Sequence, residues 1–256
     1  MNNPYKHQEV ALERYRKASA IPLFFDPGTG KTRTSLLIAE AKYNAGEINA
    51  VLVIAPNGVH KQWAVEEIPK WLSHVNTTVQ WRKNKKLFFI EGALNIVCTN
   101  IEQFSTKTRY LDYVQWATAH KTFIILDEAT RIKNPKAIRT QRLLYEFNTV
   151  IKRGKTILKS EPKTVARAIL TGTPVTNGPF DVWPMFEFLR PGYFGCNWYA
   201  FQNKFGSVVS DLCLKLRLYS FIRKSIVEII VVIGKAAGQP FDDEGRQVLA
   251  IPAPLL

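Results

Sequence analysis

Five short apolar runs, separated by stretches with helical spacing, constrain the fold of this chain more than any other feature. Each run is followed by polar residues, small residues or proline, and the runs are 21–25, 50–55, 95–98, 122–126 and 166–170. A continuous apolar run of this length between helical segments is typical of a strand buried on both faces of a sheet. The pattern therefore predicts an α/β fold with a mostly parallel central sheet flanked by helices.

Three of these runs lead directly into residues that suit phosphate or metal binding. The segments concerned are 26–32, 127–128 and 171–174. The carboxyl ends of parallel strands lie at one edge of a sheet, and ligands of such folds bind there. We therefore expect the three segments to lie together and to form one site.

The segment 26–32 reads Asp-Pro-Gly-Thr-Gly-Lys-Thr and precedes a helical stretch from 32 to 45. In a strand, glycine turn and helix of this kind, backbone N–H groups and the helix N-terminus face an anion, and Lys31 adds a full positive charge. Thr32 is placed to put its hydroxyl on a magnesium ion. Phe25 stands where the longest form of this loop has glycine, so the loop is a shorter variant. We predict that it binds a nucleotide through Asp26, Gly28, Thr29, Gly30, Lys31 and Thr32.

The carboxylate pair Asp127–Glu128 follows the apolar run 122–126. Asp127 can hold magnesium opposite Thr32, through a water molecule. Glu128 can orient and deprotonate the water that attacks a terminal phosphate. We therefore predict that Lys31, Asp127 and Glu128 are catalytic residues in nucleotide hydrolysis, with ATP and magnesium as cofactors.

The positive charge of the chain is unevenly distributed. The formal net charge is +14, and the stretch 131–167 alone contains eleven Lys or Arg and two Glu, a net +9. A local excess of this size favours a surface that binds a polyanion, and nucleic acid is the first partner to test. Within that stretch, 148–163 is polar and basic, and we interpret it as a surface insertion that contacts nucleic acid.

Membrane insertion and secretion are not indicated by the sequence. No apolar run approaches the length of a membrane span, and the N-terminus has no apolar signal region. Cys98, Cys196 and Cys213 are widely spaced and lack metal-ligand spacing, which is typical of buried thiols in a reducing compartment. We expect no membrane association and a cytoplasmic location, either bacterial or in a virus-infected host cell.

Six segments in this order resemble the Swi/Snf family of superfamily 2 helicase-like ATPases. They are 5–8, 26–32, 54–71, 98–100, 127–135 and 170–177, and the run 188–195 extends the last. Each segment is weak alone, and their order makes the resemblance specific. Arg-Ile-Lys-Asn-Pro at 131–135 points to this family rather than to RNA-directed helicases, although Thr130 stands where many members carry His.

The resemblance implies a RecA-like lobe of an ATPase that is stimulated by DNA and moves on duplex DNA. It implies that Gln8 reads adenine and that Thr171 and Thr173 couple nucleotide state to DNA contact. The residues it assigns to the DNA backbone are Pro56, Thr99, Arg131, Lys133 and Asn134. Contacts of this kind go to phosphates, so binding should tolerate any sequence and weaken with salt.

The resemblance covers a first lobe, which we place at 1–222, and leaves 223–256 as a short tail without a second helicase lobe. In the family, a second lobe supplies arginines that complete the ATP site. We therefore expect weak hydrolysis unless a partner chain supplies a second RecA-like lobe. Two alternatives remain open. One is a non-catalytic module that binds DNA or a partner, and the other is an unrelated phosphate-loop kinase or GTPase, in which Gln8 and 131–135 would have no role.

Overall fold

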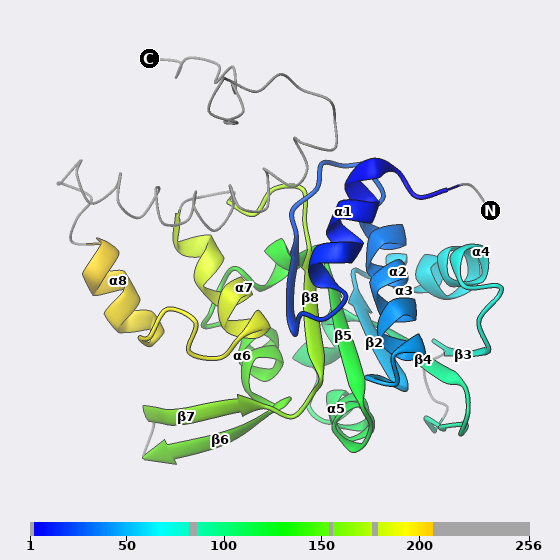
Figure 1. Cartoon of the computed structure of the whole chain (residues 1–256). Helices are drawn as coiled ribbons and strands as arrows, with labels where there is room; N and C mark the ends of the chain where they lie inside the picture. The colour runs from blue at the N-terminus through cyan, green and yellow to red at the C-terminus, as the bar shows by residue number, and fades with distance from the viewer. Residues whose placement is uncertain (1–2, 82–85, 154–155, 176–178, 207–256) are drawn as a thin grey trace, which may run out of the picture.

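The central feature of the chain is a six-stranded parallel sheet (Figure 1). A computed structural model describes residues 3–81, 86–153, 156–175 and 179–206. The strand order is β1-β8-β5-β2-β4-β3. The strands are β1 (Ala20–Leu23), β2 (Ala50–Ala55), β3 (Thr77–Gln80), β4 (Leu94–Asn100), β5 (Thr122–Asp127) and β8 (Ala166–Leu170). The predicted fold class is confirmed, and each of the five apolar runs contains or overlaps a strand.

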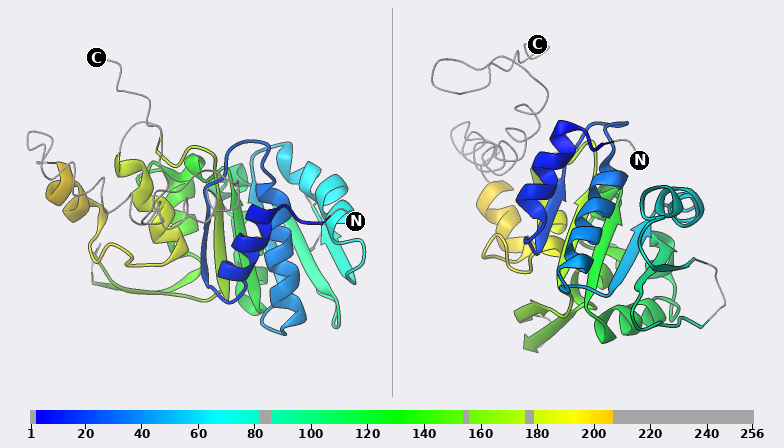
Figure 2. Two further views of the ribbon diagram at one scale, coloured as in Figure 1. Left: turned by 45° about the horizontal axis from the view of Figure 1, so that its top comes forward. Right: turned by 45° about the vertical axis from the view of Figure 1, so that its right-hand side comes forward.

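Helices cover both faces of the sheet (Figures 1 and 2). One face carries α1 (Lys6–Tyr15), α2 (Lys31–Asn44), and the continuous helical stretch of α3 (Val59–Gln62), a π-helical turn η1 (Trp63–Glu67) and α4 (Ile68–Trp71). The other carries α5 (Tyr110–Ala119), α6 (Ile138–Tyr145), α7 (Val182–Leu189) and α8 (Trp198–Gly206). Short 3₁₀ turns are η2 (Ile101–Ser105), η3 (Ala129–Ile132) and η4 (Pro179–Asp181).

The hydrophobic core is divided by the sheet into two layers. Along β2, Leu52 and Ile54 pack with the helices α5 to α8, whereas Val51 and Val53 pack with α1 and α2. All four side chains are fully buried, because successive strand residues point to opposite faces and both faces are covered. The described part of the chain from α7 to α8 adds several aromatic side chains to this core, whereas Tyr199 is 65% exposed.

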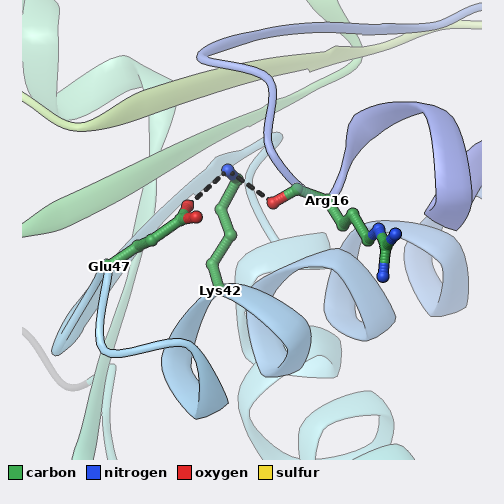
Figure 3. Close-up of polar contacts among 3 residues, drawn as sticks. All are labelled: Arg16, Lys42 and Glu47. Carbon is green, nitrogen blue, oxygen red and sulfur yellow. Dashed lines mark hydrogen bonds and ion pairs between the residues drawn. The ribbon is translucent and has the colours of Figure 1, made fainter.

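A buried lysine fastens α1 to α2 (Figure 3). Lys42 is 1% exposed, and its ammonium donates to the Arg16 carbonyl at 2.9 Å and to Glu47 Oε2 at 3.0 Å. A buried charge is tolerated when it is paired and hydrogen-bonded in this way. The end of α1 is therefore held beside the end of α2, and the start of α1 lies beside the start of α2.

The segment interpreted as a surface insertion forms a β-hairpin. Strands β6 (Asn148–Arg153) and β7 (Thr156–Pro162) pair antiparallel in a separate two-stranded sheet. The hairpin precedes β8 and projects from the lower edge of the molecule in Figure 1, where β8 begins. This edge is opposite the carboxyl ends of the strands. The contact with nucleic acid that we predict for the hairpin would therefore use a different surface from that of the residues that follow β2, β4 and β5.

The basic stretch is not entirely on the surface, and the prediction is wrong for Arg167. This side chain is 1% exposed and lies on β8. Its guanidinium donates hydrogen bonds to four acceptors: Thr164 Oγ1, the Phe147 and Phe188 carbonyls, and Asn148 Oδ1. Burial lowers the pKa of Arg167 to about 9, and the negative charge of Glu187 opposes the shift. Arg167 therefore stabilises the interior and contributes nothing to a polyanion-binding surface.

Several expectations fall on residues outside the described ranges. They concern the boundary at 222, the tail 223–256, Cys213 and Asn177. Among the described cysteines, Cys98 is buried and Cys196 half-buried, and both are free thiols. None of the helices in the described residues is long and apolar enough to cross a membrane.

Candidate nucleotide-binding site

The loop between β1 and α2 has the backbone of an anion cradle. Gly28 and Gly30 have φ of +80° and +86°, which L side chains rarely adopt. Gly30 caps α2, and no side chain caps the first turn of this helix. The first N–H groups of a helix have no intrahelical partner, and the helix dipole favours negative charge there. The N-terminus of α2 is therefore available to a phosphate group.

Lys31 folds back onto this loop. Its Nζ donates to the Phe25 carbonyl at 2.9 Å and to the Asp26 carbonyl at 3.2 Å. Thr29 also closes the turn, because its hydroxyl donates to the Asp26 carbonyl at 2.7 Å. The ammonium is thus held at the mouth of the loop by neutral acceptors that a charged phosphate oxygen can replace.

Side chains at the start of α1 contact the backbone of the phosphate loop. Gln8 is 1% exposed, and its Oε1 accepts from the Tyr5 N–H at 3.1 Å. Its Nε2 lies 3.4 Å from the Thr29 carbonyl and 3.5 Å from the Gly30 carbonyl. His7 Nε2 also lies 2.8 Å from the Thr29 carbonyl. The amide of Gln8 is therefore engaged with backbone, and its predicted role in reading adenine stays a prediction.

Asp127 is the buried carboxylate of the site, and it ends β5. It is 9% exposed, and its Oδ1 accepts from the Glu128 N–H at 3.0 Å. Its Oδ2 accepts from Trp63 Nε1 at 2.9 Å. Burial raises the pKa of Asp127, and the Trp63 hydrogen bond and the positive charge of Lys31 oppose that shift. A carboxylate with lone pairs to spare beside an ammonium fits a site for magnesium and phosphate.

Glu128 has a strained backbone. Its φ of 51° and ψ of 57° make it the one non-glycine among the described residues with a positive φ. This conformation costs an L residue about 1–2 kcal/mol, and such strain is concentrated at functional sites. The side chain is exposed, unlike that of Asp127. The sharp turn after β5 therefore separates a buried carboxylate from an accessible one.

The segment after β8 touches the phosphate loop. A Cβ added at Gly172 would lie 3.1 Å from Pro27 Cδ. The Thr171 N–H donates to the Leu23 carbonyl at 3.2 Å, and Thr171 Oγ1 accepts from the Thr173 N–H at 3.1 Å. Thr171 is fully buried and Thr173 exposed. The three segments expected at one edge are therefore brought together there.

The residues assigned to DNA contact divide into two groups. Arg131 and Asn134 are exposed and Lys133 is half-buried, on η3 and the turn after it. Arg131 makes a long ion pair with Glu102, 3.9 Å between Nη1 and Oε1. These three residues lie beyond the end of β5, so they are at the same edge as the phosphate loop.

Pro56 and Thr99 form the second group, and their side chains are buried, with Thr99 2% exposed. Asn57 is exposed, and its Oδ1 accepts from Asn100 Nδ2 at 3.4 Å, which joins the segments after β2 and β4. A DNA contact at this place would therefore use Asn57 or backbone groups rather than the Pro56 and Thr99 side chains.

Two site residues were missed by the sequence reasoning. Trp63 lies in the segment 54–71 and had no assigned role in the site, and it donates a hydrogen bond to Asp127. His7 had no assigned role, and it contacts the loop backbone. For His7, the available signal in the sequence was its position next to Gln8. For Trp63 there is no local signal, because 64 residues separate it from Asp127.

The fold and this site define a nucleotide-binding protein of the phosphate-loop class, with a RecA-like parallel sheet. The model of the SNF2-related domain matches residues 6–230. The chain belongs to the SNF2-related family.

Relatives and solved structures agree with this assignment. The chain is 28% identical to the chromatin-remodeling ATPase INO80 of Arabidopsis thaliana, over 65% of this chain and 10% of that protein. It is 28% identical to the ISWI chromatin-remodeling complex ATPase ISW1 of Saccharomyces cerevisiae, over 75% of this chain and 16% of that protein. The SWI2/SNF2 ATPase core of Sulfolobus solfataricus, solved in complex with dsDNA, matches with a TM-score of 0.68 and 26% identity. That match covers 87% of this chain and 43% of the solved chain, so this chain spans less than half of the core.

Proposed function

We propose that this chain is the ATP-binding lobe of a DNA-dependent ATPase that moves on duplex DNA. The observation that carries the proposal is the meeting of three groups at one sheet edge. They are the uncapped N-terminus of α2, the ammonium of Lys31 and the buried carboxylate of Asp127. This combination suits the phosphates of a nucleotide and a divalent cation.

Each residue has a distinct task in the proposed hydrolysis. Lys31 and the first N–H groups of α2 bind phosphate oxygens, and Thr32 and Asp127 would hold magnesium. Magnesium bound with the nucleotide supplies positive charge where negative charge develops. Glu128, the accessible carboxylate, accepts a proton from the attacking water at its carboxylate oxygen. Gln8 holds the loop in shape through the Thr29 and Gly30 carbonyls.

Duplex DNA is the proposed partner at the same edge. Support comes from the exposed Arg131 and Asn134, with Lys133 between them, and from the similar ATPase core that was solved with dsDNA. Thr171 and Thr173 lie beside the loop through Gly172, and we assign to them the coupling of nucleotide state to DNA contact. Two phosphate contacts by cations predict that affinity falls roughly tenfold over a fourfold rise in salt.

We further propose that the lobe extends over residues 1–222 and that efficient turnover requires a second RecA-like lobe, in the same chain or a partner chain. The support is that the chain covers 43% of the solved SWI2/SNF2 core. Arginines supplied from outside a nucleotide site accelerate hydrolysis by orders of magnitude. The lobe alone should therefore bind ATP weakly and hydrolyse it slowly.

The test is ATP binding with magnesium and ATPase rate with and without duplex DNA. We expect Lys31→Ala to lose ATP binding, and Glu128→Gln to keep binding and lose turnover. Lys121→Ala is the matched control, because Lys121 is exposed and precedes β5, at the opposite end of that strand. Wild-type protein that binds no magnesium-ATP would overturn the proposal. DNA binding without any turnover, even with a second lobe added, would favour a non-catalytic module, and preference for GTP would favour a switch GTPase.

A further inference from the structure

One buried hydrogen bond connects the helix after β2 to the metal-binding carboxylate. Trp63 is 1% exposed, and its Nε1–H donates to Asp127 Oδ2 at 2.9 Å. The indole nitrogen can only donate, and the ring is packed among buried side chains, so the donor has one fixed direction. Asp127 Oδ1 is held separately by the Glu128 N–H. The carboxylate is thereby fixed at both oxygens.

We propose that Trp63 is a positioning residue for the metal site, which orients the Asp127 carboxylate for magnesium bound with nucleotide. This inference rests on the function proposed above. Groups that hydrogen-bond to metal ligands fix the orientation of those ligands, and their removal typically lowers metal affinity about 10- to 100-fold. Without this hydrogen bond, the Asp127 side chain would lose rotational freedom when the metal binds, and that loss of entropy would lower metal affinity.

The backbone around Trp63 supports a functional rather than a purely structural role. Trp63 is the first residue of the π-helical turn Trp63–Glu67, which interrupts the helix between Gln62 and Ile68. Single π-helical turns inside α-helices occur frequently at functional sites. The helix itself begins at Val59, and Gly58 separates it from the exposed Asn57. The indole therefore connects the segment that would meet DNA to the carboxylate that would hold the metal.

The variant Trp63→Phe tests the proposal, because it keeps an aromatic ring and removes the donor. Nucleotide affinity is measured with and without magnesium, using a fluorescent ADP analogue. We expect the variant to bind nucleotide without magnesium as the wild type does. The gain in affinity on adding magnesium should fall about tenfold. An unchanged magnesium gain overturns the proposal, and so does an equal loss with and without magnesium, which would indicate a general structural role.

Trp71→Phe is the matched control on the same helical stretch. Trp71 Nε1 also donates to a carboxylate, Glu67 Oε2, at 2.9 Å. This hydrogen bond stays within the helical stretch, between residues four apart, and Trp71 is only half-buried. This variant should leave the magnesium gain unchanged. A fall equal to that of Trp63→Phe would contradict a specific role for Trp63.

Two further measurements separate the possible failures. In the Asp127→Asn background, Trp63→Phe should cause no additional loss of the magnesium gain, and an additional loss overturns the proposal. If Trp63→Phe does not fold, the indole ¹H–¹⁵N resonance of Trp63 in wild-type protein gives the answer. It should shift when magnesium is added to the nucleotide complex, and its failure to shift overturns the proposal. Wild-type protein without any magnesium-dependent binding would instead refute the proposed function.

Discussion

Replacement of Glu128 by glycine should stabilise the protein while abolishing hydrolysis. The φ of 51° and ψ of 57° at Glu128 lie in the left-handed region, which costs an L residue about 1–2 kcal/mol. Glycine adopts this conformation freely and loses about 0.5–1 kcal/mol through its greater freedom in the unfolded chain. The midpoints of these two ranges give a net gain of about 0.75 kcal/mol. The melting temperature should therefore rise by about 1–4 °C.

The assay pairs thermal unfolding with the DNA-stimulated ATPase rate. Glu128→Gln is the control, because it retains the left-handed backbone and an exposed side chain of the same size. Both variants should lose about 10²- to 10⁴-fold in rate with the general base removed. Only Glu128→Gly should melt at a higher temperature. A glycine variant that melts at or below the temperature of Glu128→Gln would refute the argument that this residue is strained.

Two further variants test other contacts. Gly30→Ala should cost about 0.5–1.5 kcal/mol more in urea unfolding than Gly46→Ala and should weaken nucleotide binding, because the new Cβ meets Gln8 Nε2 and the buried amide must give up its contacts with the Thr29 and Gly30 carbonyls. Gly46 also has a positive φ, +71°, but open space around it, so equal costs would rule out the clash. Glu187→Gln should stabilise the protein above pH 7, by up to about 3 kcal/mol, because burial raises the pKa of Glu187 to about 7 and its ionised form is unfavourable in the fold. The stability that protonated Glu187 contributes is fully present below about pH 4.5 and is lost as pH rises through 7. Urea unfolding at pH 4 and pH 8 should therefore show a difference in stability between wild type and Glu187→Gln only at pH 8. An equal difference at both pH values would contradict the raised pKa.

The strands of the central sheet were largely predictable because burial on both faces produces continuous apolar sequence. The run at β2 is an example, with all six residues buried. The edge strand β3 was not predicted, since its four residues are polar or half-buried and carry no apolar run. The β6–β7 hairpin was missed as a β-structure for the same reason, because a basic, polar segment resembles a loop until its register is known.

The geometry of the candidate site was predictable where it depends on the local chain, as in the glycine loop and the pair Asp127–Glu128. It was not predictable where partners come from distant segments. The burial of Arg167 depends on acceptors that α7 and the start of β6 provide. The amide of Gln8 was assigned to a ligand, and in the folded chain it contacts loop carbonyls more than twenty residues away. Sequence identifies the reactive groups, and the fold determines which of their hydrogen bonds are already made.

The position of Lys31 makes nucleotide binding an exchange of acceptors rather than a simple addition. Its ammonium is already satisfied by the Phe25 and Asp26 carbonyls, so a phosphate must displace neutral dipoles to reach it. A charged phosphate oxygen adds a Coulomb attraction to the ammonium that a neutral carbonyl does not supply. The two carbonyl contacts hold the ammonium at the loop, and under the proposed function the exchange would favour a ligand whose incoming oxygen is charged. Replacing the carbonyls by a small neutral acceptor would give no gain in binding free energy, whereas each additional negative charge on a phosphate would make the replacement more favourable.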